Sequence, residues 1–284
     1  MLAALDAGGS MLQRRGRDLL VGSSLLLLPI VALNLWATSQ AFDRTGATTL
    51  TAFGGDDVGT GLEDVAAMLA VVCGSLAAAV VGCFGAIILL GERLGRPVDL
   101  RSALAGTMRQ LPTVLVAWAV GHFWLPFVAT WSLSGTSSDS SGRLFFAVIV
   151  ATSFATATLL VVPVIVGERL GPLAALRRSW RLMRSRTSSA LGFVCTSFCV
   201  GALLLAGITG LPSLAEVFGF ITFGDYRWLA QGVMSQLGVI VVVPLTGLAT
   251  AHLYLLFRVD AEGLDIALDA DAAFGPSVYR EQSQ

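Results

Sequence analysis

The apolar stretches of this chain contain two histidines and four cysteines, side chains that can bind metals, transfer protons or undergo redox reactions. His122 and His252 each lie in such a stretch, where an ionisable residue usually indicates a functional site. At about 1.5 Å per helical residue they lie at different depths, so we expect hydrogen-bonded bundle residues and not shared metal ligands. Cys195 and Cys199 are one helical turn apart, which leaves metal or redox chemistry open, but we favour buried hydrophobic side chains.

Motifs of catalysis are missing from the sequence. The chain contains no lysine, so it has no phosphate-binding GxxxxGK[ST] loop, and HExxH and GxSxG are also absent. The longest loop between apolar stretches, residues 40–65, is too short for a soluble catalytic domain. We therefore expect no enzyme: no catalytic residue, no metal, no cofactor and no nucleic-acid partner.

The apolar stretches are long enough to cross a membrane. Of the 284 residues, 55% are hydrophobic and 13% charged, whereas soluble domains carry about 25% charged residues. A spanning helix needs about 20 apolar residues. Six stretches satisfy this, near residues 19–38, 66–90, 111–134, 144–166, 188–212 and 231–257. They lack the alternation of barrel strands, so the sequence predicts an all-α polytopic bundle of six transmembrane helices.

Arginine placement predicts the orientation of this bundle. Fifteen arginines fall in the two termini and the even-numbered loops, and only Arg44, Arg143 and Arg227 fall in the odd-numbered loops. Cytoplasmic loops carry the excess of positive charge. We expect a multi-pass protein of the cell membrane with both termini in the cytoplasm.

The sequence GERLG occurs twice, at 91–95 and 167–171, and indicates an internal repeat. Each copy ends an apolar stretch and precedes a proline, Pro97 or Pro172, at which we expect a helix to begin. A weaker third copy, LDAGGSMLQRRGR, precedes the first stretch. The predicted unit is a cytoplasmic helix followed by two spans. We therefore expect one transmembrane domain over residues 1–271, with units near 1–90, 91–166 and 167–257, a cytoplasmic helix to about 271, and a disordered tail over 272–284.

The segment after the second GERLG predicts a basic amphipathic helix. Leu173, Leu176, Trp180 and Met183 recur at spacings of three and four, which would place them on one face. Helices of this kind lie in the membrane interface and attract anionic lipids. We expect this helix to lie on the membrane surface or to pack at the base of the bundle; the alternatives are a signal that only fixes topology and a docking site for a partner. The candidate interface residues are Arg177, Arg178, Trp180, Arg181, Arg184 and Arg186.

Two further sets of residues have predicted structural roles. Glu92–Arg93 and Glu168–Arg169 lie where a span meets the cytoplasm, and each glutamate is expected to pair with an arginine of the adjoining helix and fix a hinge. Small residues recur every four positions in the second span, which allows close helix packing or a homodimer. They are Gly74, Ala78, Gly82 and Ala86.

Two segments resemble a family of actinobacterial multi-pass proteins that is termed glycerophosphoryl diester phosphodiesterase membrane-domain-like. The first signature, E-x-x-G-P-x-x-A-L-x-R-S-W-x-L, is matched by Glu168, Gly171, Pro172, Ala175, Leu176, Arg178, Ser179, Trp180 and Leu182. The second, Y-x-x-x-R-x-x-x-E-G-L-D, is matched by Tyr254, Arg258, Glu262, Gly263, Leu264 and Asp265.

This resemblance implies a six-span membrane fold and leaves activity open, because the family's phosphodiesterase resides in a separate soluble domain that this chain lacks. We expect a non-enzymatic membrane protein that organises lipids, or a partner membrane protein, at the cytoplasmic leaflet. The alternative is a transporter of a lipid-like or apolar solute, with a cavity near Pro163 and Pro244.

Overall fold

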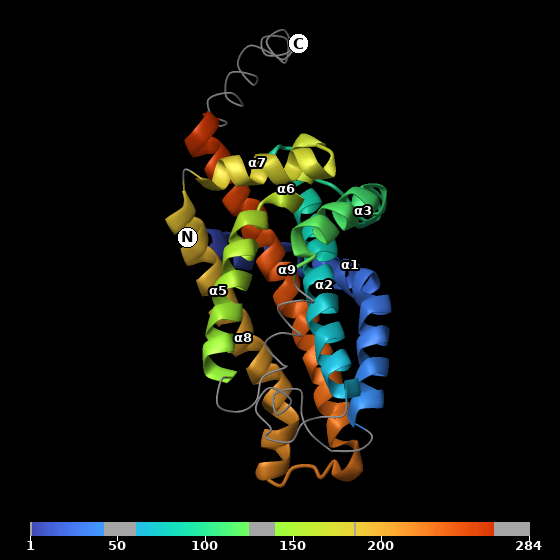
Figure 1. Ribbon diagram of the computed structural model, residues 1–284. Coiled ribbons are helices and arrows are strands. Elements are labelled where there is room, and N and C mark those ends of the chain that lie inside the picture. Colours follow the sequence, from blue (N-terminus) through green and yellow to red (C-terminus); the bar gives the residue numbers. More distant parts are fainter. Residues whose placement is uncertain (1, 43–60, 125–139, 185, 264–284) are drawn as a thin grey trace.

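The computed structural model describes residues 2–42, 61–124, 140–184 and 186–263, and over these ranges the chain is helical and contains no strand. Its elements are α1 (Leu2–Phe42), α2 (Gly61–Arg93), α3 (Leu100–His122), α5 (Ser140–Thr158), α6 (Val161–Glu168), α7 (Pro172–Arg184), α8 (Thr187–Val217), the short 3-10 helix η2 (Gly224–Tyr226) and α9 (Arg227–Glu262). Figure 1 shows them in one bundle. The predicted all-α class is confirmed for these residues.

Five helical segments of the described chain are long and apolar enough to cross a membrane. They are Gln13–Leu33, Val72–Arg93, Phe145–Glu168, Thr187–Val217 and Leu229–Glu262. Five of the six expected spans correspond to them. The remaining expected span, 111–134, begins within α3, and its residues from 125 onward lie outside the described ranges. The expected cytoplasmic helix from about 258 to 271 begins within α9. Its residues beyond Gly263 and the tail over 272–284 lie outside the described ranges as well.

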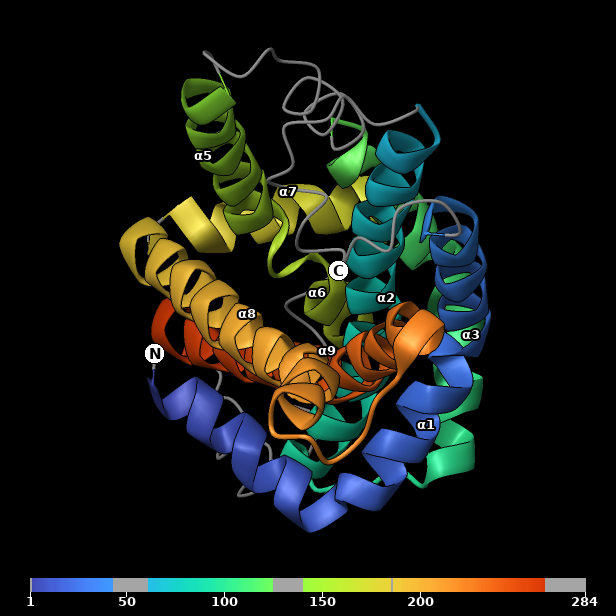
Figure 2. The same cartoon turned by 90° about the horizontal axis from the view of Figure 1, so that it is seen from below.

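Helix α9 is the centre of the bundle and packs against α1, α2 and α8. Seen from below, α8 and α1 lie on opposite sides of α9, and α2 completes the group (Figure 2). The largest buried side chains include Phe84 on α2, Phe193 on α8 and Tyr254 on α9. At one end of the bundle, α7 lies across the ends of α6 and α9, and α3 lies close to it (Figure 1).

Helix α1 is kinked at Arg15, whose backbone leaves the helical region at φ −121° and ψ 24°. Residues 2–14, here called the N-terminal arm, therefore run in a different direction from the span that follows (Figure 2). The Arg15 Nη1 donates a hydrogen bond to the carbonyl of Val98, 2.9 Å away, in the loop that follows α2. This contact fixes the kink against the same end of the bundle as α3 and α7.

The expected span at 144–166 is interrupted between Thr158 and Val161, where α5 ends and α6 begins. Pro163 explains the interruption, since proline lacks a backbone N–H and its ring clashes with the carbonyl four residues earlier, that of Leu159. Pro163 and Leu160 are both buried. The break thus lies in the core and not on the surface.

The two GERLG copies end their helices differently. In the first copy α2 continues to Arg93, and Gly95 takes a left-handed conformation at φ 68°. In the second copy α6 stops at Glu168, and Arg169 takes the left-handed position at φ 54°. Repetition of the sequence therefore does not repeat the local structure.

The helices after the two copies also begin differently. Helix α7 begins at Pro172, as predicted. Helix α3 begins at Leu100 and not at Pro97, because the Asp99 carboxylate accepts a hydrogen bond from the Ser102 N–H, 3.4 Å away, and caps the helix there. Capping chemistry outweighs the preference of proline for the first turn.

Only half of the small-residue series on α2 packs as expected. Gly82 lies at a close crossing with α9, where a Cβ on Gly247 would be 2.9 Å from the Cα of Gly82, and Ala86 is fully buried. Ala78, however, is exposed, and a Cβ on Gly74 would meet nothing within 4 Å. Next to Ala78, the buried Ala77 belongs to a cluster that includes Val239, Ile240 and Val243 of α9, so α2 presents a different face at this level.

We predict that Gly247→Ala lowers the free energy of unfolding by about 1–3 kcal/mol, because the new methyl group must displace the backbone of α2. Gly74→Ala is the matched control on the facing helix and should leave stability unchanged or raise it, since alanine favours helix. Thermal unfolding in detergent measures both. Equal stabilities of the two variants would contradict the close crossing.

Candidate functional site

Helix α7 is anchored to the bundle through small and polar residues. Its buried side chains are Ala175, Ser179, Leu182 and Met183. The Ser179 hydroxyl donates a hydrogen bond to the carbonyl of Ala157, 3.1 Å away, in the last turn of α5. Carbonyls in the last turn of a helix lack partners within that helix. Ser179 thus satisfies a carbonyl beside the break between α5 and α6 and fixes the rotation of α7.

Arg178 joins α7 to the ends of α6 and α9. Its Nε lies 3.1 and 3.0 Å from the two carboxylate oxygens of Glu168, and its Nη2 donates to a carboxylate oxygen of Glu262. Partial burial acts to lower the pKa of Arg178, but the hydrogen bonds to Glu262 and Glu168 outweigh it and raise that pKa. The guanidinium is therefore held in its charged form between two carboxylates.

Tyr254 and Arg258, on successive turns of α9, complete this group. The Tyr254 hydroxyl donates to Glu168 over 3.1 Å and accepts a hydrogen bond from Arg258 Nη1 over 3.3 Å. Arg258 Nε also donates to Glu262 over 3.0 Å. We call these five residues, Glu168, Arg178, Tyr254, Arg258 and Glu262, the Glu168 cluster. Two arginines balance two glutamates, so the cluster is neutral overall and serves to tie three helices together.

Residues of the second GERLG copy allow the Glu168 cluster to form. A Cβ on Gly167 would lie 2.8 Å from the Tyr254 hydroxyl oxygen, so only glycine lets α9 approach closely enough. Glu168 makes the expected ion pair with an arginine of the following helix, while Arg169 turns the chain toward α7. Tyr254, Arg258 and Glu262 were not expected to take part, although their spacing of four residues places them on one helical face.

The first GERLG copy makes a different contact. Glu92 pairs with Arg14 of the N-terminal arm, 3.7 Å away, and not with an arginine of α3 as expected. The arm crosses the end of α2, whereas α3 begins only after a loop. Arg14 of the arm therefore lies closer to Glu92 than the arginines of α3 do. Arg93 is exposed.

The exposed side of α7 carries apolar and basic residues together. Leu173 and Trp180 are 61% and 59% exposed. Arg177, Arg181 and Arg184 are exposed on the same side and make no ion pair with any residue in the described ranges. We call these five residues the outer face of α7.

The outer face differs from the sequence-based prediction for this helix in three respects. Arg178 points inward to the Glu168 cluster, and Arg186 pairs with Asp260 of α9 over 3.2 Å. Met183, expected beside Trp180, is buried. Small residues pack α7 against the bundle, so the helix is rotated from the orientation that its apolar spacing predicts.

The residues expected to be simple packing residues divide between the core and the surface. His122 stacks between Trp118 and Trp124, with ring centroids 5.7 and 6.4 Å away. Cys195 and Cys199 are exposed, not buried, because α8 packs through its opposite side. No group of three metal-ligating side chains occurs in the described ranges.

Comparison with protein-family models, with curated proteins and with solved structures finds no match to this chain. The resemblance to the membrane-domain-like family therefore stays a prediction from the two signatures.

We predict that Arg178→Gln lowers the free energy of unfolding by about 2 kcal/mol or more, because hydrogen bonds to two charged groups are lost. Its neighbour Arg177→Gln removes the same charge from the outer face and should change stability by less than about 0.5 kcal/mol. Denaturant titration in detergent measures both. If the two variants unfold alike, the cluster does not hold α7.

Proposed function

We propose that this chain is a non-enzymatic integral membrane protein that organises lipids or partner proteins at the cytoplasmic leaflet. The observation that carries the proposal is the outer face of α7, where Leu173 and Trp180 stand beside Arg177, Arg181 and Arg184. A helix pinned on one side by the Glu168 cluster presents these residues in one fixed orientation.

The chemistry of the outer face suits a membrane surface. Tryptophan and leucine enter the boundary between headgroups and acyl chains, while arginine extends its charged group to the phosphates. Each arginine near an anionic leaflet contributes about 1 kcal/mol, so the three together contribute ~3 kcal/mol. Since no described carboxylate neutralises them, this attraction is available to a lipid or to an acidic partner.

The membrane arrangement that accompanies this function is also part of the proposal. We infer six spans, three repeat units and cytoplasmic termini in the cell membrane. Support comes from α3, α7 and the stretch around the kink of α1 that carries Arg14, Arg15 and Arg17, three basic segments at one end of the bundle (Figure 1). The family resemblance gains support from the Glu168 cluster, in which residues of both signatures meet.

A transporter is the second candidate, because the break between α5 and α6 is the kind of interruption that lines some substrate paths. The side chains around the break weigh against it: Leu160, Val161 and Val164 are at most 4% exposed. A Cβ on Gly121 of α3 would also lie only 3.1 Å from Thr158. The break is therefore closely packed by α3 and α7, and we place this candidate behind the first.

We predict that the triple variant R177Q/R181Q/R184Q retains less anionic lipid, or less of the partner, than the native protein. The protein is extracted from its membrane in polymer discs, and mass spectrometry measures its lipids and proteins relative to the bulk membrane. Enrichment of anionic lipid, or of one acidic partner, should fall clearly below that of the native protein.

The control R96Q/R101Q/R109Q removes three exposed charges in and before α3, at the same end of the bundle. It should keep the native profile. Identical lipid and protein profiles in the triple variant and the native protein would refute a binding role for the outer face of α7.

A further inference from the structure

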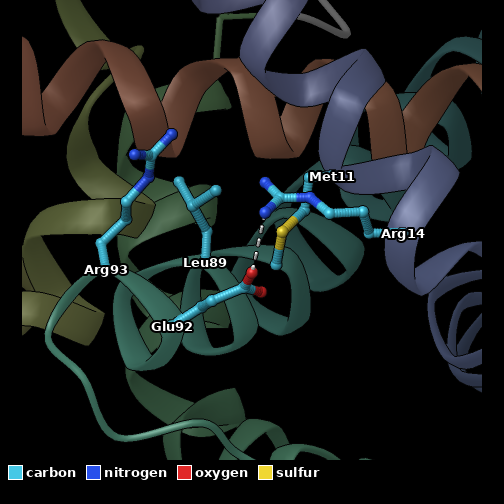
Figure 3. Close-up of a pocket in the computed structure, with 5 residues that line it drawn as sticks. All are labelled: Met11, Arg14, Leu89, Glu92 and Arg93. Atoms are coloured by element: carbon cyan, nitrogen blue, oxygen red, sulfur yellow. Dashed lines mark ion pairs between the residues drawn. The ribbon is translucent and has the colours of Figure 1, made fainter.

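A cavity of about 280 Å³ lies between the N-terminal arm and the end of α2. It is lined by Met11, Arg14, Leu89, Glu92 and Arg93. Met11 and Leu89 are 2% and 1% exposed and form an apolar floor. Figure 3 shows Arg14 reaching from α1 toward the Glu92 carboxylate, with Arg93 beyond Leu89. The volume is close to the lower limit for ligand pockets, which suits a small polar group.

The cavity is positioned at the boundary of two membrane spans. One span of the described chain begins at Gln13, next to Arg14, and another ends at Arg93. The polar side chains that line the cavity therefore lie at the level of phospholipid headgroups. Below that level α1 exposes apolar side chains, among them Val21, Leu25 and Leu28, along which acyl chains can lie.

The charges of the cavity favour an anion. Arg14 and Arg93 contribute two positive charges and Glu92 one negative charge, which leaves a net charge of +1. The Arg14–Glu92 ion pair is 3.7 Å long, beyond hydrogen-bond distance, so the Arg14 guanidinium retains N–H groups for another acceptor. Arg93 makes no ion pair with a residue that the structure describes. A phosphodiester provides the oxygens that both guanidinium groups prefer.

Glu92 adds a second requirement. Its Oε2 atom is buried, and no donor within the described ranges reaches it. A buried carboxylate oxygen without a donor is unfavourable. A ligand with a hydroxyl group beyond its phosphate would donate to this carboxylate when the side chain turns its Oε2 atom toward the cavity, and would leave the charge balance unchanged.

We propose that this cavity binds the headgroup of an anionic phospholipid whose phosphodiester contacts Arg14 and Arg93 and whose terminal hydroxyl donates to Glu92. The site is separate from the outer face of α7, so it adds a selective lipid contact to the function proposed above. It also ties the N-terminal arm to α2 through the lipid.

The test uses the full-length protein in a zwitterionic detergent and short-chain probes with identical dioctanoyl tails. Phosphatidylglycerol carries the phosphodiester and hydroxyl groups, phosphatidylmethanol carries the phosphodiester alone, and phosphatidylethanolamine replaces the hydroxyl with an ammonium group. Binding is measured by native mass spectrometry and by the shift in melting temperature. We expect one saturable site that prefers phosphatidylglycerol to phosphatidylmethanol by about tenfold, as expected for one satisfied buried group.

Two variants assign the site. Arg93→Gln changes an exposed position with no ion pair among the described residues, so the variant should fold normally. It should weaken the binding of phosphatidylglycerol at least tenfold. Glu92→Ala, which removes the acceptor, should abolish the preference over phosphatidylmethanol. The α7 variant R177Q/R181Q/R184Q should leave the single site intact, which separates this proposal from the previous one.

Unchanged binding of phosphatidylglycerol to Arg93→Gln would overturn the site. Tighter binding of phosphatidylethanolamine would overturn the hydroxyl assignment. Competition by inorganic phosphate as strong as by the lipid would show that the cavity takes a soluble anion and would overturn the lipid assignment.

Discussion

The carboxylate of Glu168 is the constraint on which the arrangement of this end of the bundle depends. It lies at the last residue of α6, where the helix dipole disfavours negative charge. Arg178 from α7 and Tyr254 and Arg258 from α9 compensate for it with hydrogen bonds and opposite charge. Because these donors come from elements far apart in the sequence, the three helix ends must meet at one point. The crosswise position of α7 follows from that meeting.

The rotation of α7 depends on a second contact, on the other side of the same helix. Pro163 interrupts the span and leaves α5 to end in the core, where a carbonyl without a partner is costly. Ser179 satisfies the carbonyl of Ala157 and so covers the break. Ser179 and Arg178 together leave α7 one orientation, with Trp180 and three arginines directed away from the bundle. The proposed surface function therefore rests on interactions inside the protein.

Much of the fold could be predicted from the sequence because hydropathy and helix signals act locally. Five of the spans follow from apolar stretches of about 20 residues. The start of α7 at Pro172 and the pairing of Glu168 with Arg178 follow from residues at most ten positions apart. The rotation of α7 could not be predicted in this way, since apolar spacing groups Met183 with Leu173 and Trp180 on one face, whereas Met183 packs inside with Ser179 and the other two are exposed. The Arg14–Glu92 pair joins residues 78 positions apart, so the weak third repeat copy could indicate a helix before the first span but not this contact. Cys195 was expected to be buried, because a helix that faces lipid is as apolar in composition as one in a core.

The central claim is that Glu168 and Arg178 act together to hold α7, and a double-mutant cycle tests it directly. The free energies of unfolding of Glu168→Gln, Arg178→Gln, the double variant and the native protein are measured under reversible conditions in detergent. Residues that contact each other in one network show coupling of about 0.5–3 kcal/mol, whereas independent sites add within about 0.5 kcal/mol. We predict a coupling energy above ~1 kcal/mol, with the double variant little less stable than either single variant. Additive effects of the two substitutions would contradict the account.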